Sequence, residues 1–134
     1  MPDIEVPAPE ASSARLMSRF DCARSDAGSA VRVTVAGELD IATLPELDRQ
    51  LHVAQAEAGL VVLDLRRLEF IDLCAARQLL FVDRRIRYEG GRLVVVRGSA
   101  EVHWVFALIG LDCQLEFIDQ PPADSLFAAE SRPL

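Results

Sequence analysis

The stretch Leu60-Val61-Val62-Leu63-Asp64-Leu65 decides the fold class, because five of its six residues are apolar. A nearly continuous apolar run of this length is typical of a strand that is buried on both faces, as the central strands of parallel sheets are. We therefore interpret residues 60–65 as the central strand of the domain, and we place the flanking segments relative to it.

On the N-terminal side, two segments predict an antiparallel hairpin. Apolar and charged residues alternate over residues 17–23, and valines alternate with polar residues over 31–35. Both patterns are typical of strands with one buried face. Residues 25–29 (SDAGS) have the composition of a turn. Gly37 is the expected end of the second strand.

A capping box predicts the start of the first helix. Thr43 and Glu46 are spaced so that the threonine hydroxyl accepts from an early backbone N–H while the glutamate reaches back. Pro45 is tolerated in the first turn of a helix, where its missing N–H costs nothing. Apolar residues then recur at helical spacing over 44–54, and Gly59 is a good stop signal.

Two further helices and two further strands are expected after the central strand. Asp72 and Ser99 are each placed to cap a helix. Residues 93–96 form an apolar strand between these helices, and residues 115–117 form a weaker one. A short terminal helix is expected over 124–130. The inward stripe of the helix that Asp72 caps consists of Ala75, Leu79, Val82 and Ile86.

This alternation of strands and helices with short connections predicts βαβ units in a mixed sheet. We expect an α/β domain over residues 16–130, with a β-sheet of four to five strands backed by about four helices. Residues 1–15 contain proline, serine and acidic residues without an apolar pattern, so we expect a disordered tail there and no signal peptide. Residues 131–134 form the expected C-terminal tail.

The composition argues against several classes of function. The formal net charge is −7, whereas nucleic-acid-binding domains normally carry a basic surface. The chain has no lysine, which excludes a Schiff-base lysine and a P-loop lysine. Its apolar runs are too short to span a bilayer, and its three widely spaced cysteines indicate reduced thiols. We therefore expect a cytoplasmic protein that neither binds nucleic acid nor inserts into membranes.

Few residues suggest chemistry of their own. His52 and His103 follow no metal-ligand spacing, and we interpret His52 as a surface residue. Asp40, Asp64 and Asp72 could meet near strand ends and hold a metal ion, although Asp40 and Asp72 fit turn and cap roles better. We predict no metal, no cofactor and no catalytic residue, and thus a protein that acts by binding.

Cys74 lies at the expected start of the second helix. A helix dipole lowers the pKa of a thiol in that position, which would make the thiol reactive and suit a redox switch. Cysteine is also a common small packing residue, and we favour the packing role.

Two segments together resemble the STAS domain. Val35-Ala36-Gly37-Glu38-Leu39-Asp40 is a strand that ends in GELD before a capped helix, and residues 62–65 (VLDL) are followed by Leu68-Glu69-Phe70-Ile71-Asp72. Together with GGRLVVV at 90–96 and ALIGLD at 107–112, these segments are similar to the anti-sigma-factor antagonists (anti-anti-sigma factors) of bacteria. The resemblance implies a STAS-like sheet of four or five strands backed by helices.

The resemblance also implies a protein partner. Members of the family bind an anti-sigma factor that is also a serine kinase, and thereby free the sigma factor. The kinase phosphorylates a serine directly after the aspartate that corresponds to Asp72. The residues that the resemblance assigns to the partner surface are Glu38, Asp40, Ile41, Thr43, Asp72, Leu73, Cys74, Ala75 and Ala76.

The chain departs from the family pattern at the phosphorylation site. The family sequence there reads approximately D-S-S-G-L, whereas this chain reads Asp72-Leu73-Cys74-Ala75-Ala76. Leu73 has no hydroxyl and cannot accept phosphate, so the usual switch is absent at this position. Two alternatives stand beside an anti-sigma-factor antagonist: a STAS-type regulatory subunit of a transport or sensory complex, and a redox switch centred on Cys74.

Overall fold

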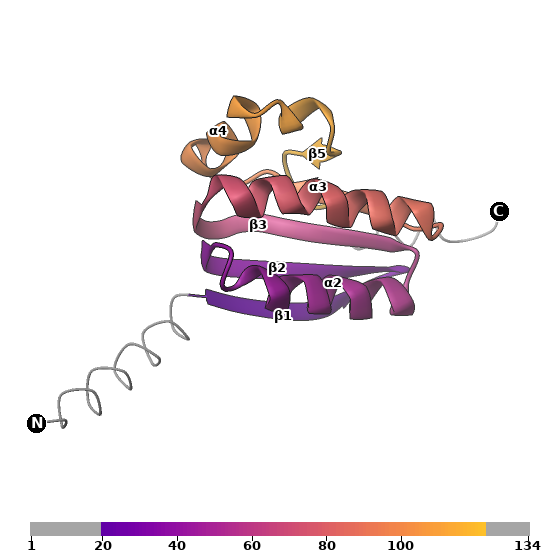
Figure 1. The fold of residues 1–134 in the computed structure, drawn as a ribbon. Coiled ribbons are helices and arrows are strands. Elements are labelled where there is room, and N and C mark those ends of the chain that lie inside the picture. Colours follow the sequence, from indigo (N-terminus) through magenta and orange to yellow (C-terminus); the bar gives the residue numbers. More distant parts are fainter. Residues whose placement is uncertain (1–19, 123–134) are drawn as a thin grey trace, which may run out of the picture.

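A computed structural model describes residues 20–122 of the chain, which form a five-stranded sheet in the order β1-β2-β3-β4-β5 (Figure 1). The strands are β1 (Phe20–Ala27), β2 (Ala30–Leu39), β3 (Leu60–Ile71), β4 (Arg92–Val96) and β5 (Phe117–Ile118). β1 is antiparallel to β2, and every other neighbouring pair is parallel. The predicted mixed sheet is therefore confirmed, with the apolar run at 60–65 in its middle strand.

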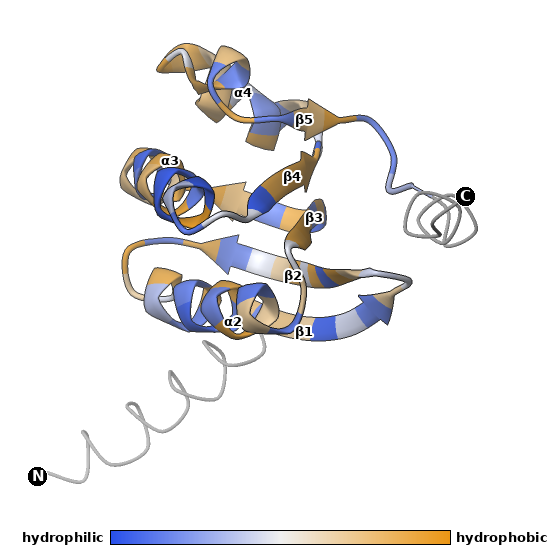
Figure 2. Cartoon of the chain, turned by 90° about the vertical axis from the view of Figure 1, so that its right-hand side faces the viewer, coloured by the Kyte–Doolittle hydropathy of each residue, from blue (hydrophilic) through white to orange (hydrophobic). Residues whose placement is uncertain are grey.

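Helices connect the parallel strands. They are α2 (Leu44–Glu57), α3 (Leu73–Tyr88) and α4 (Ala100–Leu108), and the short 3-10 helix η2 (Leu111–Cys113) follows α4. Because successive crossovers share one hand, helices that link neighbouring strands in this order pack on the same face of the sheet. Figure 2 shows α2 and α3 on that common side. No helix within residues 20–122 has the length and apolar character to cross a membrane.

One hydrophobic cluster joins the three helices to the sheet. Fully buried side chains come from all of these elements, and the largest include Leu47, Leu51, Leu63, Leu79, Ile86, Leu93 and Phe106. The stripe predicted for the helix after Asp72 is confirmed, because all four of its residues are buried. The structure therefore has the predicted α/β architecture. The terminal helix expected over 124–130 lies outside the described residues.

The hairpin is longer than its sequence pattern predicts. β1 continues to Ala27, so the expected turn at 25–29 contracts to Gly28 and Ser29. Gly28 has a φ of +71°, and two-residue hairpin turns favour glycine because they need such a positive φ. The sequence predicts that Gly37 ends β2, but the strand continues to Leu39. Gly37 has a φ of +92° within the strand, next to an irregularity in the pairing with β3.

β3 also extends further than predicted, to Ile71 instead of Leu65. Two register shifts interrupt its pairing with β2, and across them the buried positions are spaced by three residues: Leu65, Leu68 and Ile71. Such bulges insert extra residues and break the strict alternation of a strand. The loss of alternation after Leu65 therefore marks the bulges and not the end of the strand.

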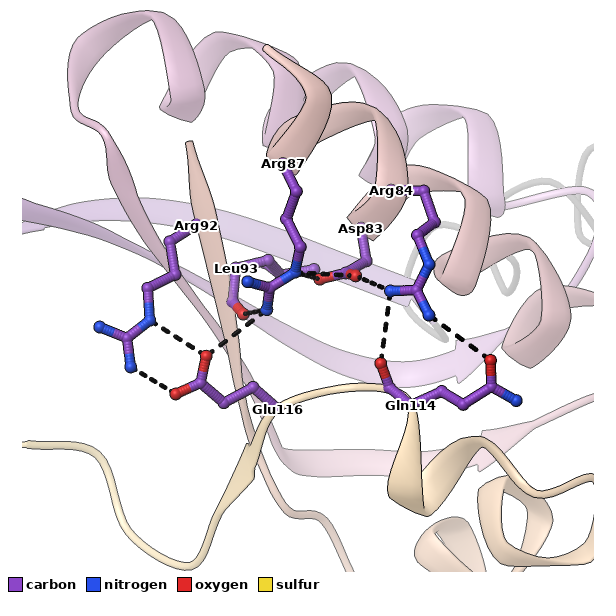
Figure 3. Close-up of polar contacts among 7 residues, drawn as sticks. All are labelled: Asp83, Arg84, Arg87, Arg92, Leu93, Gln114 and Glu116. Atoms are coloured by element: carbon purple, nitrogen blue, oxygen red, sulfur yellow. Dashed lines mark hydrogen bonds and ion pairs between the residues drawn. The ribbon is translucent and has the colours of Figure 1, made fainter. Parts of the chain in front are cut away.

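A buried carboxylate ties α3 to the edge of the sheet (Figure 3). Asp83 is fully buried, and it accepts from Arg84 Nη1 at 2.7 Å and from Arg87 Nε at 3.0 Å. Arg87 also donates to the Leu93 carbonyl at 3.1 Å and to Glu116 at 3.4 Å. Arg92 and Glu116 complete the network, so α3, β4 and the segment before β5 are held by one set of charges.

We expect Arg87→Met to lower the free energy of unfolding by about 2 kcal/mol, because it leaves the buried Asp83 carboxylate with Arg84 alone. Arg77→Met is the matched control, since Arg77 is exposed on the same helix. Urea unfolding of both variants measures the difference. Equal stability of the two variants would show that the network contributes nothing to the fold.

Candidate functional site

The carboxyl ends of β2 and β3 lie side by side. Leu39 pairs with Ile71, and the Asp72 N–H donates to the Leu39 carbonyl at 3.1 Å. An aspartate directly follows each strand: Asp40 follows β2 and Asp72 follows β3. We call these two positions, where the chain leaves the sheet, the exits. Loops at the carboxyl ends of parallel strands commonly carry binding residues, because a rigid sheet positions them.

Asp40 organises the first of these two exits. Its Oδ1 accepts from the N–H groups of Ala42 and Thr43, each at 3.0 Å, which is the pattern of an Asx-turn. The Thr43 hydroxyl accepts from the Asp40 N–H at 2.9 Å. The predicted capping box is therefore wrong. Thr43 does occupy the N-cap position, but its hydroxyl bonds back into the turn, and Glu46 accepts from Arg49 at 2.7 Å.

Asp72 organises the second exit as a helix N-cap. Its Oδ1 accepts from the Ala75 N–H at 2.7 Å, and α3 begins at Leu73. Ser99 caps α4 in the same way, with its Oγ accepting from the Val102 N–H at 3.2 Å. Both predicted caps are confirmed. Both aspartates therefore use one carboxylate oxygen, Oδ1, to hold their own backbone.

The two exits turn large apolar side chains toward solvent. Ile41 is 60% exposed and Leu73 is 41% exposed, and Phe70, near the end of β3, is 48% exposed. Cys74 is exposed beside Leu73. Large apolar side chains that are exposed near the ends of neighbouring strands are candidates for an interaction site. We call Ile41, Phe70, Leu73 and Cys74 the edge surface.

Two grooves adjoin the edge surface. A groove of about 370 Å³ runs between α2 and α3 and is lined by Ile41, Leu44, Pro45, Asp48, Gln78 and Val82. A second groove of about 210 Å³ is lined by Glu69, Phe70, Ile71, Glu101, Val102 and Val105. Each groove contains one of the exposed residues of the edge surface and a floor of partly apolar side chains. This arrangement suits the apolar side chains of a protein partner.

Three of the residues that the resemblance assigns to the partner surface are buried or half-buried in the domain. Ala75 and Ala76 are completely buried under α3, because they occupy the side of the helix that packs on the sheet, so their side chains offer no contact surface. Glu38 is half-buried within β2, where it pairs with Phe70 of β3. The packing role that we favoured for Cys74 is wrong, since its side chain is exposed.

The three aspartates considered as metal ligands have other partners. Asp64 is buried in the middle of β3 and accepts from Arg66 at 3.1 and 2.9 Å. Burial alone would raise the pKa of Asp64, but the hydrogen bonds from Arg66 outweigh it and hold that pKa below its usual range. Within residues 20–122, no three histidine, cysteine, aspartate or glutamate side chains gather in a metal-binding group. His52 lies on the surface, as predicted.

The model of a known family, described as "Mlab, STAS domain", matches residues 22–118. The chain belongs to the STAS-domain family. The resemblance found in the sequence is thereby confirmed at the level of the family. No curated protein sequence matches the chain.

Several solved structures share this fold. An anti-sigma factor antagonist from Mycobacterium paratuberculosis is 23% identical, with a TM-score of 0.64, and the match covers 82% of this chain and 92% of that one. The unphosphorylated anti-sigma factor antagonist SpoIIAA is 20% identical, with a TM-score of 0.59 and coverage of 75% and 89%. The murine anion transporter Slc26a9 is 16% identical, with a TM-score of 0.64 and coverage of 80% and 19%. At these identities the similarity establishes the fold.

The sequence of this chain contains a repeated pattern that marks part of the edge surface. Leu39-Asp40-Ile41 and Ile71-Asp72-Leu73 share one pattern, in which a buried apolar residue, an aspartate and an exposed apolar residue follow each other. The exposure of Phe70 has a different origin. Phe70 directly precedes the buried Ile71, so strand alternation places its side chain on the opposite face of the sheet.

The two kinds of residue in these exits have different effects on stability. We expect Asp40→Ala to lower the free energy of unfolding by about 1 kcal/mol, because two backbone N–H groups lose their acceptor. Ile41→Ser should cost no more than about 0.5 kcal/mol, because Ile41 is mostly exposed. Urea unfolding compares the variants. A cost for Ile41→Ser equal to that of Asp40→Ala would mean that Ile41 packs within the domain.

Proposed function

We propose that this STAS domain is an anti-sigma-factor antagonist, a non-catalytic protein that binds an anti-sigma factor in the bacterial cytoplasm and so frees a sigma factor. The observation that carries this proposal is the edge surface. Its apolar side chains are held outward by two aspartate-stabilised turns on a rigid sheet. The shared fold of two solved anti-sigma factor antagonists supports the choice of partner class.

Leu73 suits permanent binding better than switched binding. A serine in this place accepts a phosphate of about −1.5 to −2 charges in the family that the sequence resembles, whereas leucine stays neutral. A leucine gains roughly 1.5–3 kcal/mol on complete burial, and Leu73 is still 41% exposed in the free domain. A partner that covers it therefore gains about 1 kcal/mol from this side chain. We propose that the domain stays competent to bind without release by phosphorylation at this position.

A second candidate is a STAS subunit of a transport complex. The observations that favour it are the family description, "Mlab, STAS domain", and the shared fold with part of an anion transporter, of which this chain covers only 19%. Affinity purification of the tagged chain from its own cells separates the candidates. Recovery of an anti-sigma factor supports the first candidate, and recovery of a transport ATPase supports the second.

Charged substitutions on the edge surface test the main proposal. We expect Leu73→Glu and Ile41→Asp to weaken binding of the anti-sigma factor at least tenfold, about 1.4 kcal/mol, because each buries an unpaired charge at the interface. Melting by circular dichroism should stay close to that of the parent, because both side chains are exposed. Calorimetric titration with the purified anti-sigma factors of the same genome gives the affinities.

Tyr88→Glu is the matched control for these titrations. Tyr88 is 93% exposed and ends the 16-residue helix that Leu73 begins, which separates the two by roughly 22 Å. The control should bind like the parent. Parental affinity in both edge variants, or loss of binding in Tyr88→Glu alone, would place the partner surface elsewhere on the domain.

A further inference from the structure

The helix α4 carries apolar side chains on both of its sides. Val102 and Phe106 on its inner side are buried in the main core. On its outer side, Trp104 is 60% exposed and Leu108 is 54% exposed. A helix that is apolar all round is normally covered all round. The outer side of α4 is therefore a candidate for a surface that a partner covers.

The exposed residues of this outer side form a ridge along the helix. Ala100, Trp104 and Leu108 are all exposed and follow each other at intervals of four residues, so their side chains are neighbours on one side of the helix. We call these three residues the α4 ridge. In the commonest packing of two helices, ridges with this spacing interdigitate. The α4 ridge thus has the form of one half of a helix–helix contact.

Two hollows beside the α4 ridge provide room for the side chains of a second helix. One hollow of about 330 Å³ is lined by Ala100, Glu101 and Trp104. The groove of about 210 Å³ described above also includes Glu101, and it reaches Glu69 and Phe70 at the end of β3. Glu101 therefore lines both hollows, and the small side chain of Ala100 leaves the first one open.

The charge of these hollows indicates the chemistry of the partner. Glu69 and Glu101 are both exposed, and within residues 20–122 neither carboxylate forms an ion pair. A helix with arginine or lysine residues beside its apolar face would supply the missing counter-charges. Complementary charges of this kind favour one partner over others and speed the encounter.

The same charges disfavour two other occupants. A second copy of this chain would bring another net charge of −7 and the same two carboxylates to the contact. The surface of an anionic membrane would repel those carboxylates as well. A basic amphipathic helix of another protein fits both the apolar ridge and the acidic hollows.

We propose that the α4 ridge is a second binding surface, which takes a basic amphipathic helix of a partner protein. α4 lies on the β5 side of the molecule, away from α2 (Figure 1). The inference adds to the proposed function and does not depend on it, because the experiment below uses no anti-sigma factor.

Trp104 reports on this surface directly, because it is the only tryptophan of the chain. The probe is a synthetic helical peptide with leucines along one face and arginines beside them. This peptide should shift the emission of Trp104 to shorter wavelength and saturate, because its leucines shield the indole from water. A peptide with serines in place of the leucines, which keeps the arginines, should cause no shift.

Variants of the domain locate the binding through the anisotropy of a labelled copy of the peptide. Trp104→Ser should weaken binding by about tenfold or more, because a central aromatic anchor carries much of the energy of an interface. Tyr88→Ser is the matched control, since Tyr88 is an exposed aromatic residue on α3, and it should bind like the parent. Circular dichroism melting of both variants should match the parent, because both side chains are exposed.

A charge exchange tests the acidic hollows separately. The parent should prefer the arginine peptide to one with glutamates in place of the arginines, and Glu69→Arg combined with Glu101→Arg should reverse this preference. An unchanged preference, equal binding of the serine peptide, or equal losses in Trp104→Ser and Tyr88→Ser would each overturn the proposal.

Two further measurements test the other occupants. Vesicles of phosphatidylglycerol should leave the emission of Trp104 unchanged, and sedimentation should show no dimer that Trp104→Ser dissociates. A shift with vesicles but none with the peptide would assign the ridge to a membrane. A dimer that depends on Trp104 would assign it to a second copy of the chain, and either result would overturn the proposal.

Discussion

The pairing of the last residues of β2 with the last residues of β3 is the constraint on which the candidate site depends. Leu39 faces Ile71, and the Asp72 N–H donates to the Leu39 carbonyl at 3.1 Å. Because the two strands end in register, their aspartates leave the sheet side by side. Each carboxylate then bonds to its own backbone, which fixes the direction of the residue that follows. The exposure of Ile41 and Leu73 is a consequence of this backbone geometry.

Rigidity is the second requirement of such a surface, and α3 provides it. The helix is fixed at its start by the Asp72 cap and in its second half by the buried Asp83 network. The backbone at the first position of a helix held in this way has little freedom to lose when a partner binds. The apolar residues of the edge surface are therefore presented in a defined arrangement, at the cost of leaving them in water when no partner is bound.

The sequence allowed the fold to be predicted but only part of the site. The apolar run at 60–65 and the caps Asp72 and Ser99 are local signals, and the structure confirms them. The bulges of β3 are set by its pairing with β2, so the true end of that strand could not be predicted from its own residues. The buried Asp83 was missed for a similar reason, because its arginine partners and the elements that they join meet only in the folded chain.

Methyl NMR tests most directly whether the paired strand ends present the binding surface. The domain is labelled at isoleucine and leucine methyl groups, and an anti-sigma factor that binds it is added in steps. The account predicts that the methyl resonances of Ile41 and Leu73 shift or broaden first. The resonances of Leu108, a leucine on α4 that is 54% exposed, should stay in place. Perturbation of Leu108 with unchanged resonances for Ile41 and Leu73 would contradict the account.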